Sequence, residues 1–284
     1  MKRVDPTRTV LIRRKFKSEL KNRFNNLNDA VEQYFETLYD LVTIRDNSVV
    51  VGHFKSYLQQ SIEKFIEGNW YQRYLELSYK QGLDKAFNYS KPAYLLTTSE
   101  GISQGFRMTF LNLAHDSKNL SQIFLMTKEY LLNDLNNFVT QVMGDFTRGL
   151  VSSLSKTKIL QDLNKHINTA FKRAVSIANT EVVRANAYGT LDGLKQLKVR
   201  EVTVVPELQE TLTANENVEY STAGDSRVCP LCRPFDKVII PLQEAYSLIP
   251  IHTNCRCSFS PITTPADYLR FDEALEEFSE LADL

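Results

Sequence analysis

The stretch Cys229-Pro230-Leu231-Cys232, followed after nineteen residues by His252-Thr253-Asn254-Cys255-Arg256-Cys257, decides how the last third of this chain folds. All four cysteines of the 284-residue sequence fall within it. A Cys-x-x-Cys segment turns two thiolates toward one point, and a second chelating pair about 15–20 residues further on completes a tetrahedron. Thiolate and imidazole donors suit zinc better than magnesium or calcium. The spacing therefore predicts one structural zinc ion.

Five candidate donors compete for the four positions of this predicted shell. The first choice is Cys229, Cys232, His252 and Cys255, because His-x-x-Cys repeats the spacing of the first pair. In the alternative sets Cys257 replaces His252 or Cys255. The ordinary alternative is four buried or disulfide-paired cysteines beside a surface histidine. Because four donors fill the shell and leave no open position, we expect a structural site and no catalysis.

Proline separates this region from the rest of the chain. Two of the nine prolines, Pro6 and Pro92, lie before residue 200, so only the first part can carry long uninterrupted helices. Apolar residues also recur there at helical spacing on two consecutive stretches. These residues are Leu120, Phe124, Leu131, Leu135, Phe138, Val142, Phe146 and Leu150, and then Ile167, Phe171, Ala174, Ala178, Val182 and Ala185.

These patterns predict a mainly α fold, in which a long-helix N-terminal body precedes a small α+β zinc-stabilised C-terminal module. The body covers 1–195, and a linker at Asn88–Pro92 suggests a subdivision near 88–98. The module covers 196–264, and an acidic helix or tail covers 265–284. Further helices are expected at 8–44, 53–67, 70–87 and 99–115. Short strand-like runs lie at 202–205, 218–221, 238–240 and 258–260.

Charge is balanced overall but uneven along the chain. Lys+Arg and Asp+Glu number 34 each, yet residues 1–24 carry a net charge of +7 and residues 266–284 a net charge of −6. Such a split suggests two electrostatic partners, or contact between the two ends. Arg13, Arg14, Lys15 and Lys17 are candidates for contact with DNA phosphates or an acidic partner. The ordinary alternative is a solvated helix face.

The sequence gives no sign of a membrane protein. No apolar run approaches the ~18 residues that a membrane span requires, and the basic start leads into no apolar signal core. We therefore expect a cytoplasmic, reducing compartment. In such a compartment clustered cysteines indicate a metal site before they indicate disulfides.

Two segments resemble a known family. Thr222-Ala-Gly-Asp-Ser-Arg-Val-Cys229-Pro-Leu-Cys232 and Pro250-Ile-His252-Thr-Asn-Cys255-Arg-Cys257, with Pro261, resemble the C-terminal signature of the phage head morphogenesis family. These are minor head proteins similar to protein F of phage Mu. Upstream, Arg173–Gly189 is similar to the helix that precedes this signature. The likeness covers about residues 165–262.

The chain departs from the family pattern at two places. Asn179 stands where the family usually has Arg before the Thr-Glu pair, and Asp236-Lys237 lacks the usual intervening glycine. The second departure alters a hairpin turn and leaves the donors intact.

The resemblance implies a protein present in few copies in the virion, in the capsid interior or at the portal vertex, and assembled in the host cytoplasm. Its implied partners are the portal protein and major capsid or scaffold proteins, with packaged DNA as a further contact. Glu181 and Arg184, three residues apart on the family helix, are most simply a surface ion pair. As the first alternative, they anchor the helix to a portal surface or to the zinc module; as the second, Glu181 is a catalytic residue.

Two other functions stay open. A metal-dependent DNA nuclease would have to use Asp225 and Asp236, which are the only carboxylates near the zinc pattern. A DNA-binding adaptor would use the four basic residues around the zinc pattern, which together with Asp225 and Asp236 give a net charge of only +2. These basic residues are Arg227, Arg233, Lys237 and Arg256. Since the sequence carries no catalytic motif set, we do not expect an enzyme.

Overall fold

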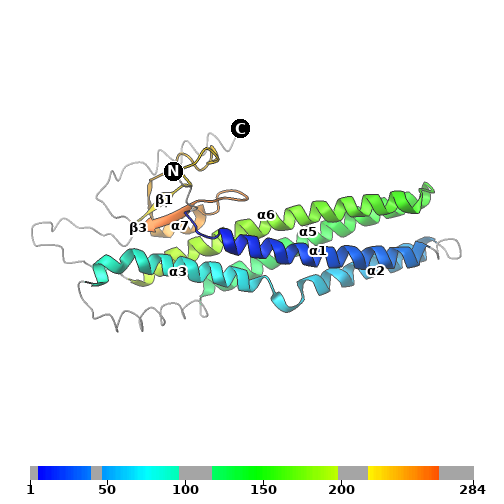
Figure 1. The fold of residues 1–284 in the computed structure, drawn as a ribbon, viewed down its shortest axis with the longest axis horizontal. Helices are drawn as coiled ribbons and strands as arrows, with labels where there is room; N and C mark the ends of the chain where they lie inside the picture. Colours follow the sequence, from blue (N-terminus) through cyan, green and yellow to red (C-terminus); the bar gives the residue numbers. More distant parts are fainter. Residues whose placement is uncertain (1–5, 40–46, 96–116, 198–216, 262–284) are drawn as a thin grey trace, which may run out of the picture. The chain divides into compact units, whose positions relative to one another are not determined.

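The computed structural model describes residues 6–39, 47–95, 117–197 and 217–261 (Figure 1). Within these ranges five long helices precede a three-stranded sheet, which confirms the predicted fold class. The helices are α1 (Val10–Tyr39), α2 (Asn47–Ile66), α3 (Gln72–Leu95), α5 (Lys118–Val151) and α6 (Lys156–Leu197), with the short 3-10 helix η1 (Glu67–Asn69) after α2. The strands are β1 (Asn217–Ser221), β2 (Ile239–Pro241) and β3 (Ser258–Pro261), with helix α7 (Leu242–Leu248) between the last two.

The chain divides into two compact units that alternate along the sequence. Unit 1 consists of Met1–Arg13, Arg73–Phe124 and Asn179–Leu284, and unit 2 consists of Arg14–Gln72 and Leu125–Ala178. Four helices, α1, α3, α5 and α6, contribute residues to both units, although α3 gives unit 2 only its first residue, Gln72.

Unit 2 is built from parts of α1, α2, α5 and α6, and aromatic side chains fill its interior. The buried face of α1 repeats every three or four residues, as an amphipathic helix requires. Phe146 of α5 lies 5.8 Å from Phe35 of α1 and 4.7 Å from Phe54 of α2, measured between ring centroids. Phe24 of α1 makes similar contacts with Phe65 and Phe171. Each such buried ring contributes about 1.5–3 kcal/mol.

The apolar stripe predicted on α5 is largely buried, and the structure explains its one irregular step. The sequence pattern takes one step of seven, from Phe124 to Leu131. Thr127 occupies the missing position and is fully buried. A threonine can hold a core position because its methyl group packs while its hydroxyl finds a local partner.

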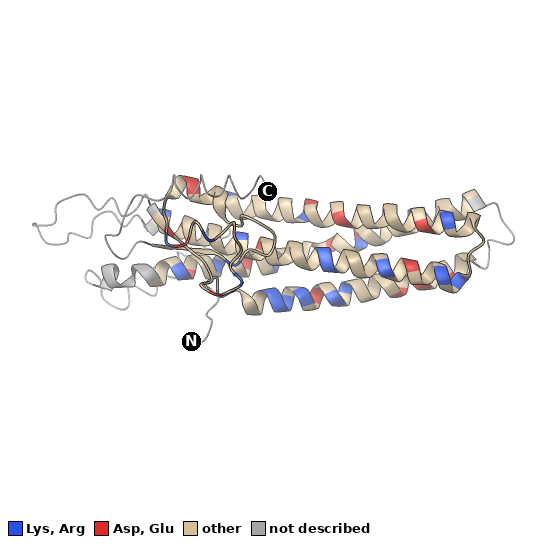
Figure 2. Ribbon diagram, turned by 90° about the horizontal axis from the view of Figure 1, so that it is seen from above, with Lys and Arg blue, Asp and Glu red and all other residues tan. Residues whose placement is uncertain are grey.

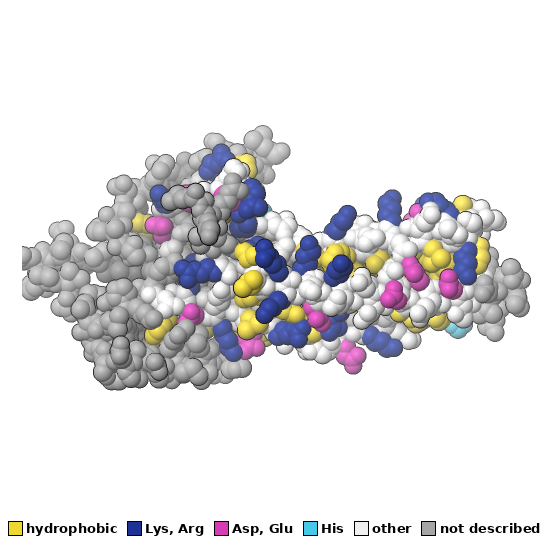
Figure 3. All heavy atoms as spheres, viewed as in Figure 1, with side chains coloured by type: hydrophobic (Ala, Val, Ile, Leu, Met, Phe, Trp, Pro, Cys, Tyr) yellow, Lys and Arg dark blue, Asp and Glu magenta, His cyan; other side chains and the backbone are white. Residues whose placement is uncertain are grey.

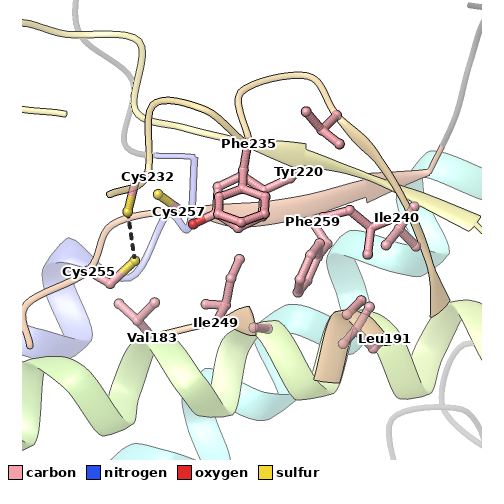
Figure 4. Packing of buried hydrophobic residues seen from close by; sticks show 14 of the residues in the cluster. Val183, Leu191, Tyr220, Cys232, Phe235, Ile240, Ile249, Cys255, Cys257 and Phe259 are labelled. Atoms are coloured by element: carbon pink, nitrogen blue, oxygen red, sulfur yellow. Dashed lines mark hydrogen bonds between the residues drawn. The ribbon is translucent and has the colours of Figure 1, made fainter. Parts of the chain in front are cut away.

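Unit 1 contains the sheet, whose strand order is β2-β1-β3 with both pairs antiparallel. The register sets Val218 opposite Ile240 and Tyr220 opposite Phe259. The inward face of the sheet packs against the last turns of α6, through Val183 and other side chains drawn in Figure 4. The strands predicted at 218–221, 238–240 and 258–260 are confirmed within a residue or two.

Some sequence predictions fail or fall elsewhere. The linker expected at Asn88–Pro92 is wrong, because α3 continues through it to Leu95. A proline costs a helix one backbone hydrogen bond but does not always end it. Helix α7 was not predicted. The expected strand at 202–205, the helix at 99–115 and the tail at 265–284 lie outside the described residues.

The basic cluster near the start of the chain lies on α1. Figure 2 shows Lys and Arg concentrated on the first half of this helix, and Arg14, Lys15 and Lys17 are exposed, whereas Arg13 is half-buried. In the surface view, basic side chains lie among acidic and apolar ones instead of forming one continuous patch (Figure 3). No helix in the described part of the chain has the length and apolar character to cross a membrane.

Candidate metal centre

Two short turns, each closed by the same backbone hydrogen bond, present four of the five candidate donors. In the first, the backbone N–H of Cys232 donates to the carbonyl of Cys229 at 3.2 Å, and the same N–H lies 3.3 Å from the Cys229 sulfur. In the second, the N–H of Cys255 donates to the carbonyl of His252 at 3.2 Å. The His-x-x-Cys segment therefore repeats the hydrogen bond that closes the Cys-x-x-Cys turn, but Asn254 adopts a left-handed conformation, with φ of 60°, that its counterpart Leu231 does not.

The structure brings all five predicted donors into one cluster. His252 Nε2 lies 3.0 Å from the sulfur of Cys229 and 3.2 Å from that of Cys232, and the Cys232 and Cys255 sulfurs are 4.0 Å apart. Bond lengths to tetrahedral zinc imply about 3.8 Å between two sulfurs and about 3.5 Å between sulfur and nitrogen. The observed sulfur–sulfur spacing of 4.0 Å is close to the first value, and the sulfur–nitrogen spacings of 3.0 and 3.2 Å are somewhat shorter than the second.

The five donors form two overlapping groups that share Cys232. One group is Cys229, Cys232 and His252, and the other is Cys232, Cys255 and Cys257; within each, all ligand atoms lie within 4.8 Å of one another. None of the four cysteines is in a disulfide, so the disulfide alternative is wrong for this structure. The cluster could bind a metal such as zinc, and the geometry alone does not single out one set of four.

The orientation of His252 fits a metal ligand. Its Nδ1 lies 2.8 Å from the backbone carbonyl of Thr253. A carbonyl only accepts hydrogen bonds, so Nδ1 carries the hydrogen and Nε2 presents its lone pair to the two sulfurs. Metal-bound histidines usually donate their other N–H in this way, because the hydrogen bond fixes both the tautomer and the ring.

An arginine fork ties the two turns together. Arg256, between two donor cysteines, makes parallel hydrogen bonds of 2.9 and 2.8 Å to the carboxylate of Asp225. Asp225 also accepts the backbone N–H of Arg227 at 2.9 Å, and its side chain is only 4% exposed. The Arg256 guanidinium, helped by Arg227, holds the pKa of Asp225 well below its usual range. The fork fixes the loop before Cys229 to the segment that carries the last two cysteines.

The second local carboxylate has a similar structural role. Asp236 accepts hydrogen bonds from the backbone N–H of Thr222 at 3.0 Å and from its hydroxyl at 2.7 Å. Both carboxylates that the nuclease alternative requires are therefore engaged in holding loops. The neighbouring Lys237 adopts a left-handed conformation, with φ of 64°, in the turn where the family glycine is missing.

The sulfurs lie at the edge of the hydrophobic core of unit 1. Tyr220 of β1 is fully buried, with ring centroids 5.5 Å from Phe235 and 5.8 Å from Phe259. Figure 4 shows its hydroxyl pointing toward the sulfur of Cys257. Burial raises the pKa of this hydroxyl well above its usual value, and the thiols of Cys257 and its neighbours raise it further.

The Cys/His cluster docks directly on α6. The backbone N–H of Asn254 donates to the Thr180 hydroxyl at 2.9 Å, and Asn179 donates its side-chain N–H to the Asn254 side-chain oxygen at 3.1 Å. On α3, the buried Lys85 donates to the Ser258 hydroxyl and, at 2.8 Å, to the carbonyl of Phe259. Helices from distant parts of the sequence therefore hold both ends of the Cys/His segment.

The pair of Glu181 and Arg184 is present but is not the surface pair that the sequence suggested. The Arg184 Nε donates to Glu181 at 2.9 Å, and the Glu181 side chain is only 2% exposed. Burial raises the pKa of Glu181, while Arg184 opposes this shift. The sequence could not show this burial, because it depends on unit 1 packing around α6. A role of this pair, or of Arg13, Arg14, Lys15 and Lys17, in partner contact stays a prediction.

Sequence reasoning missed a second polar centre in unit 1. Asp192 near the end of α6 accepts hydrogen bonds from Tyr246 of α7 at 2.6 Å and from Asn119 of α5 at 2.8 Å. Tyr79 of α3 also donates to it, and Ser117, which precedes α5, lies at 3.4 Å. One carboxylate thus joins four helices. No local sequence pattern predicts such a centre, because its members are separated by up to 167 positions along the chain.

Comparison with models of protein families, with curated proteins and with solved structures finds no match to this chain. The resemblance to phage minor head proteins therefore stays an expectation that depends on the motif residues alone.

Proposed function

We propose that this protein is a phage minor head protein, a non-enzymatic component of head assembly that associates with the portal, with one structural zinc ion fixing its C-terminal module. The observation that supports this most directly is the contact between the two family-like segments. Thr180, of the α6 segment, accepts the backbone N–H of Asn254, which lies between two donors of the Cys/His signature. Two motifs far apart in the sequence thus meet as one folded module.

Zinc is the metal that this donor set suits best. Thiolates and imidazole are soft or borderline ligands, and the sulfur–sulfur spacing of 4.0 Å between Cys232 and Cys255 is close to that of a tetrahedral site. Four of the candidate donors lie on two short turns, which the hydrogen bonds between Arg256 and Asp225 connect. This connection limits the movement of the donors. A shell of four such donors leaves no position for a substrate, so the ion stabilises the fold.

The charged residues near the Cys/His cluster already have partners within the module, and this favours a structural role over a nuclease or a DNA-binding adaptor. Asp225 and Asp236 hold loops, so neither is a ready ligand for a catalytic ion. Arg256 and Arg227 both pair with Asp225, which reduces the basic charge that an adaptor could offer to DNA phosphates. Contact with packaged DNA then falls to the exposed basic residues of α1.

The test has two parts. Metal analysis of the purified chain should find one zinc ion per molecule, and the protein should copurify with the portal protein from procapsids and be present in purified particles. A chain that carries no zinc would overturn the metal assignment. A protein that is absent from particles and procapsids would overturn the assembly role, and metal-dependent cleavage of plasmid DNA that Asp225→Ala abolishes would replace it with the nuclease.

A further inference from the structure

Tyr220 occupies a position from which it can reach the metal donors. It lies on β1, the central strand, directly opposite Phe259 of β3. Side chains alternate along an extended chain, so Cys257, two residues before Phe259, lies on the same inward face and diagonally across from Tyr220. An aromatic side chain spans such a diagonal, and Figure 4 shows the hydroxyl directed at the Cys257 sulfur.

The hydroxyl of Tyr220 is buried without the hydrogen bond that a buried polar group needs. The residue is fully buried, and among the described residues its hydroxyl has no hydrogen-bond partner. Native proteins rarely leave a buried hydroxyl in this condition, because it has lost its bonds to water without replacement. Phenylalanine would fill the same space without that loss, so the tyrosine requires an acceptor.

A metal-bound thiolate would be that acceptor. A neutral thiol accepts hydrogen bonds weakly, whereas an ionised sulfur accepts them strongly. Cys257 is itself buried, and its sulfur belongs to the three-sulfur group with Cys232 and Cys255. An ionised sulfur in this core is stable only if a positive ion holds it, because burial of an unpaired charge is very unfavourable.

We propose that Cys257 is one of the four metal ligands and that Tyr220 is its positioning residue, donating an O–H···S hydrogen bond to the bound thiolate. This inference rests on the proposed zinc site and goes beyond it by choosing between donor sets that spacing left open. It also gives β1 a role in the site, because zinc binding would satisfy a hydroxyl at the centre of the sheet.

Tyr220→Phe is the decisive variant, since it keeps the ring contacts with Phe235 and Phe259 and removes only the hydroxyl. We expect the affinity for zinc, measured by competition with a chromophoric chelator, to fall about 10-fold or more, as for other partners of metal ligands. If Tyr220 had only a structural role, its replacement by phenylalanine would not lower the affinity for zinc. Removal of an unpartnered hydroxyl would favour the folded module and leave the affinity unchanged or higher.

Tyr246→Phe is the matched control. Its hydroxyl donates to Asp192 and not to the sulfurs, so this variant should retain the zinc affinity of the unmodified chain. The second measurement is the charge-transfer absorption of the cobalt(II)-loaded protein, which reports bound thiolates. Cys257→Ser should weaken this band and lower the affinity, and Tyr220→Phe should shift it.

The outcomes separate this inference from the function on which it rests. If the unmodified chain binds one zinc ion but Tyr220→Phe or Cys257→Ser binds it equally well, the inference is overturned and the structural zinc site stands. If the unmodified chain binds no zinc or cobalt, both are overturned.

Discussion

Gly82 of α3 and Gly189 of α6 mark a point where two helix backbones touch. A Cβ atom on Gly82 would lie 2.2 Å from the carbonyl oxygen of Asn186, and one on Gly189 would lie 2.1 Å from the carbonyl oxygen of Tyr79. Both obstacles are backbone atoms, which cannot rotate away. The contact fixes α3 against the same part of α6 that carries the metal module.

Alanine at either glycine should therefore destabilise unit 1. Because the two helices must separate to admit a methyl group, we expect Gly82→Ala or Gly189→Ala to cost about 1–3 kcal/mol, the usual range for overpacking. Gly52→Ala and Gly144→Ala are the controls, since a Cβ atom at either site meets nothing within 4 Å. They should stabilise their helices by about 0.5–1 kcal/mol. Chemical denaturation measures all four, and equal effects at the two kinds of site would contradict the close contact.

The fork between Arg256 and Asp225 should control metal affinity. Arg256→Lys keeps the charge but cannot make two parallel hydrogen bonds, so the two donor turns lose their connection. We expect zinc affinity to fall about 10- to 100-fold, the range seen for residues that orient metal ligands. Arg233→Lys, an exposed position one residue after Cys232, serves as the control and should have no effect. Chelator competition provides the measurement, and an unchanged affinity in Arg256→Lys would argue that the fork is incidental.

The hydrogen bond from Asn254 to Thr180 should hold the metal module on α6. Thr180→Val keeps the shape of the side chain but leaves the backbone N–H of Asn254 without its acceptor, at a cost of about 1–3 kcal/mol. Thr169→Val, on the same helix, removes only an exposed hydroxyl bonded to the carbonyl of Lys165. This control should change stability much less. Hydrogen exchange at the Asn254 amide tests the effect locally, and equal protection in both variants would exclude this contact as an anchor.

Sequence patterns were enough to predict the parts of the fold that local physics decides. The seven buried residues of α1 follow one another at steps of three and four, which only a helix turns to one side. The two donor turns were equally predictable, because Cys-x-x-Cys and His-x-x-Cys share the same spacing and the same closing hydrogen bond. The set of four donors was not predictable, because the choice between Cys255 and Cys257 depends on which side chains of the β-sheet lie near each sulfur.

Long-range contacts explain why the sequence failed to predict three features of the structure. Glu181 looks like a surface residue in a polar stretch, but unit 1 covers that face of α6. Asp192 has no informative neighbours in the sequence, and its partners come from three other helices. The segment around Pro92 remains helical, although proline usually favours a break. Tertiary packing overrides local preference at each of these places.

The buried Glu181 should make stability depend on pH in a direction opposite to that of most carboxylates. Its pKa is raised above the ordinary 4.5 by burial, so the folded state holds the proton more tightly than the unfolded state does. Its contribution to stability is therefore fully present below pH 4.5 and is lost as the pH rises through the folded pKa. Glu181→Gln has no proton to lose and still presents an acceptor to Arg184.

The stability of Glu181→Gln relative to the unmodified chain should consequently increase as the pH rises above 4.5, and then level off. Urea unfolding midpoints at a series of pH values, with zinc in excess for both proteins, provide the measurement. Zinc loss in acid affects both chains alike and cancels in the comparison. If the unmodified chain instead gains stability over the variant as the pH rises, attraction to Arg184 outweighs burial, and the folded pKa of Glu181 lies below its ordinary value.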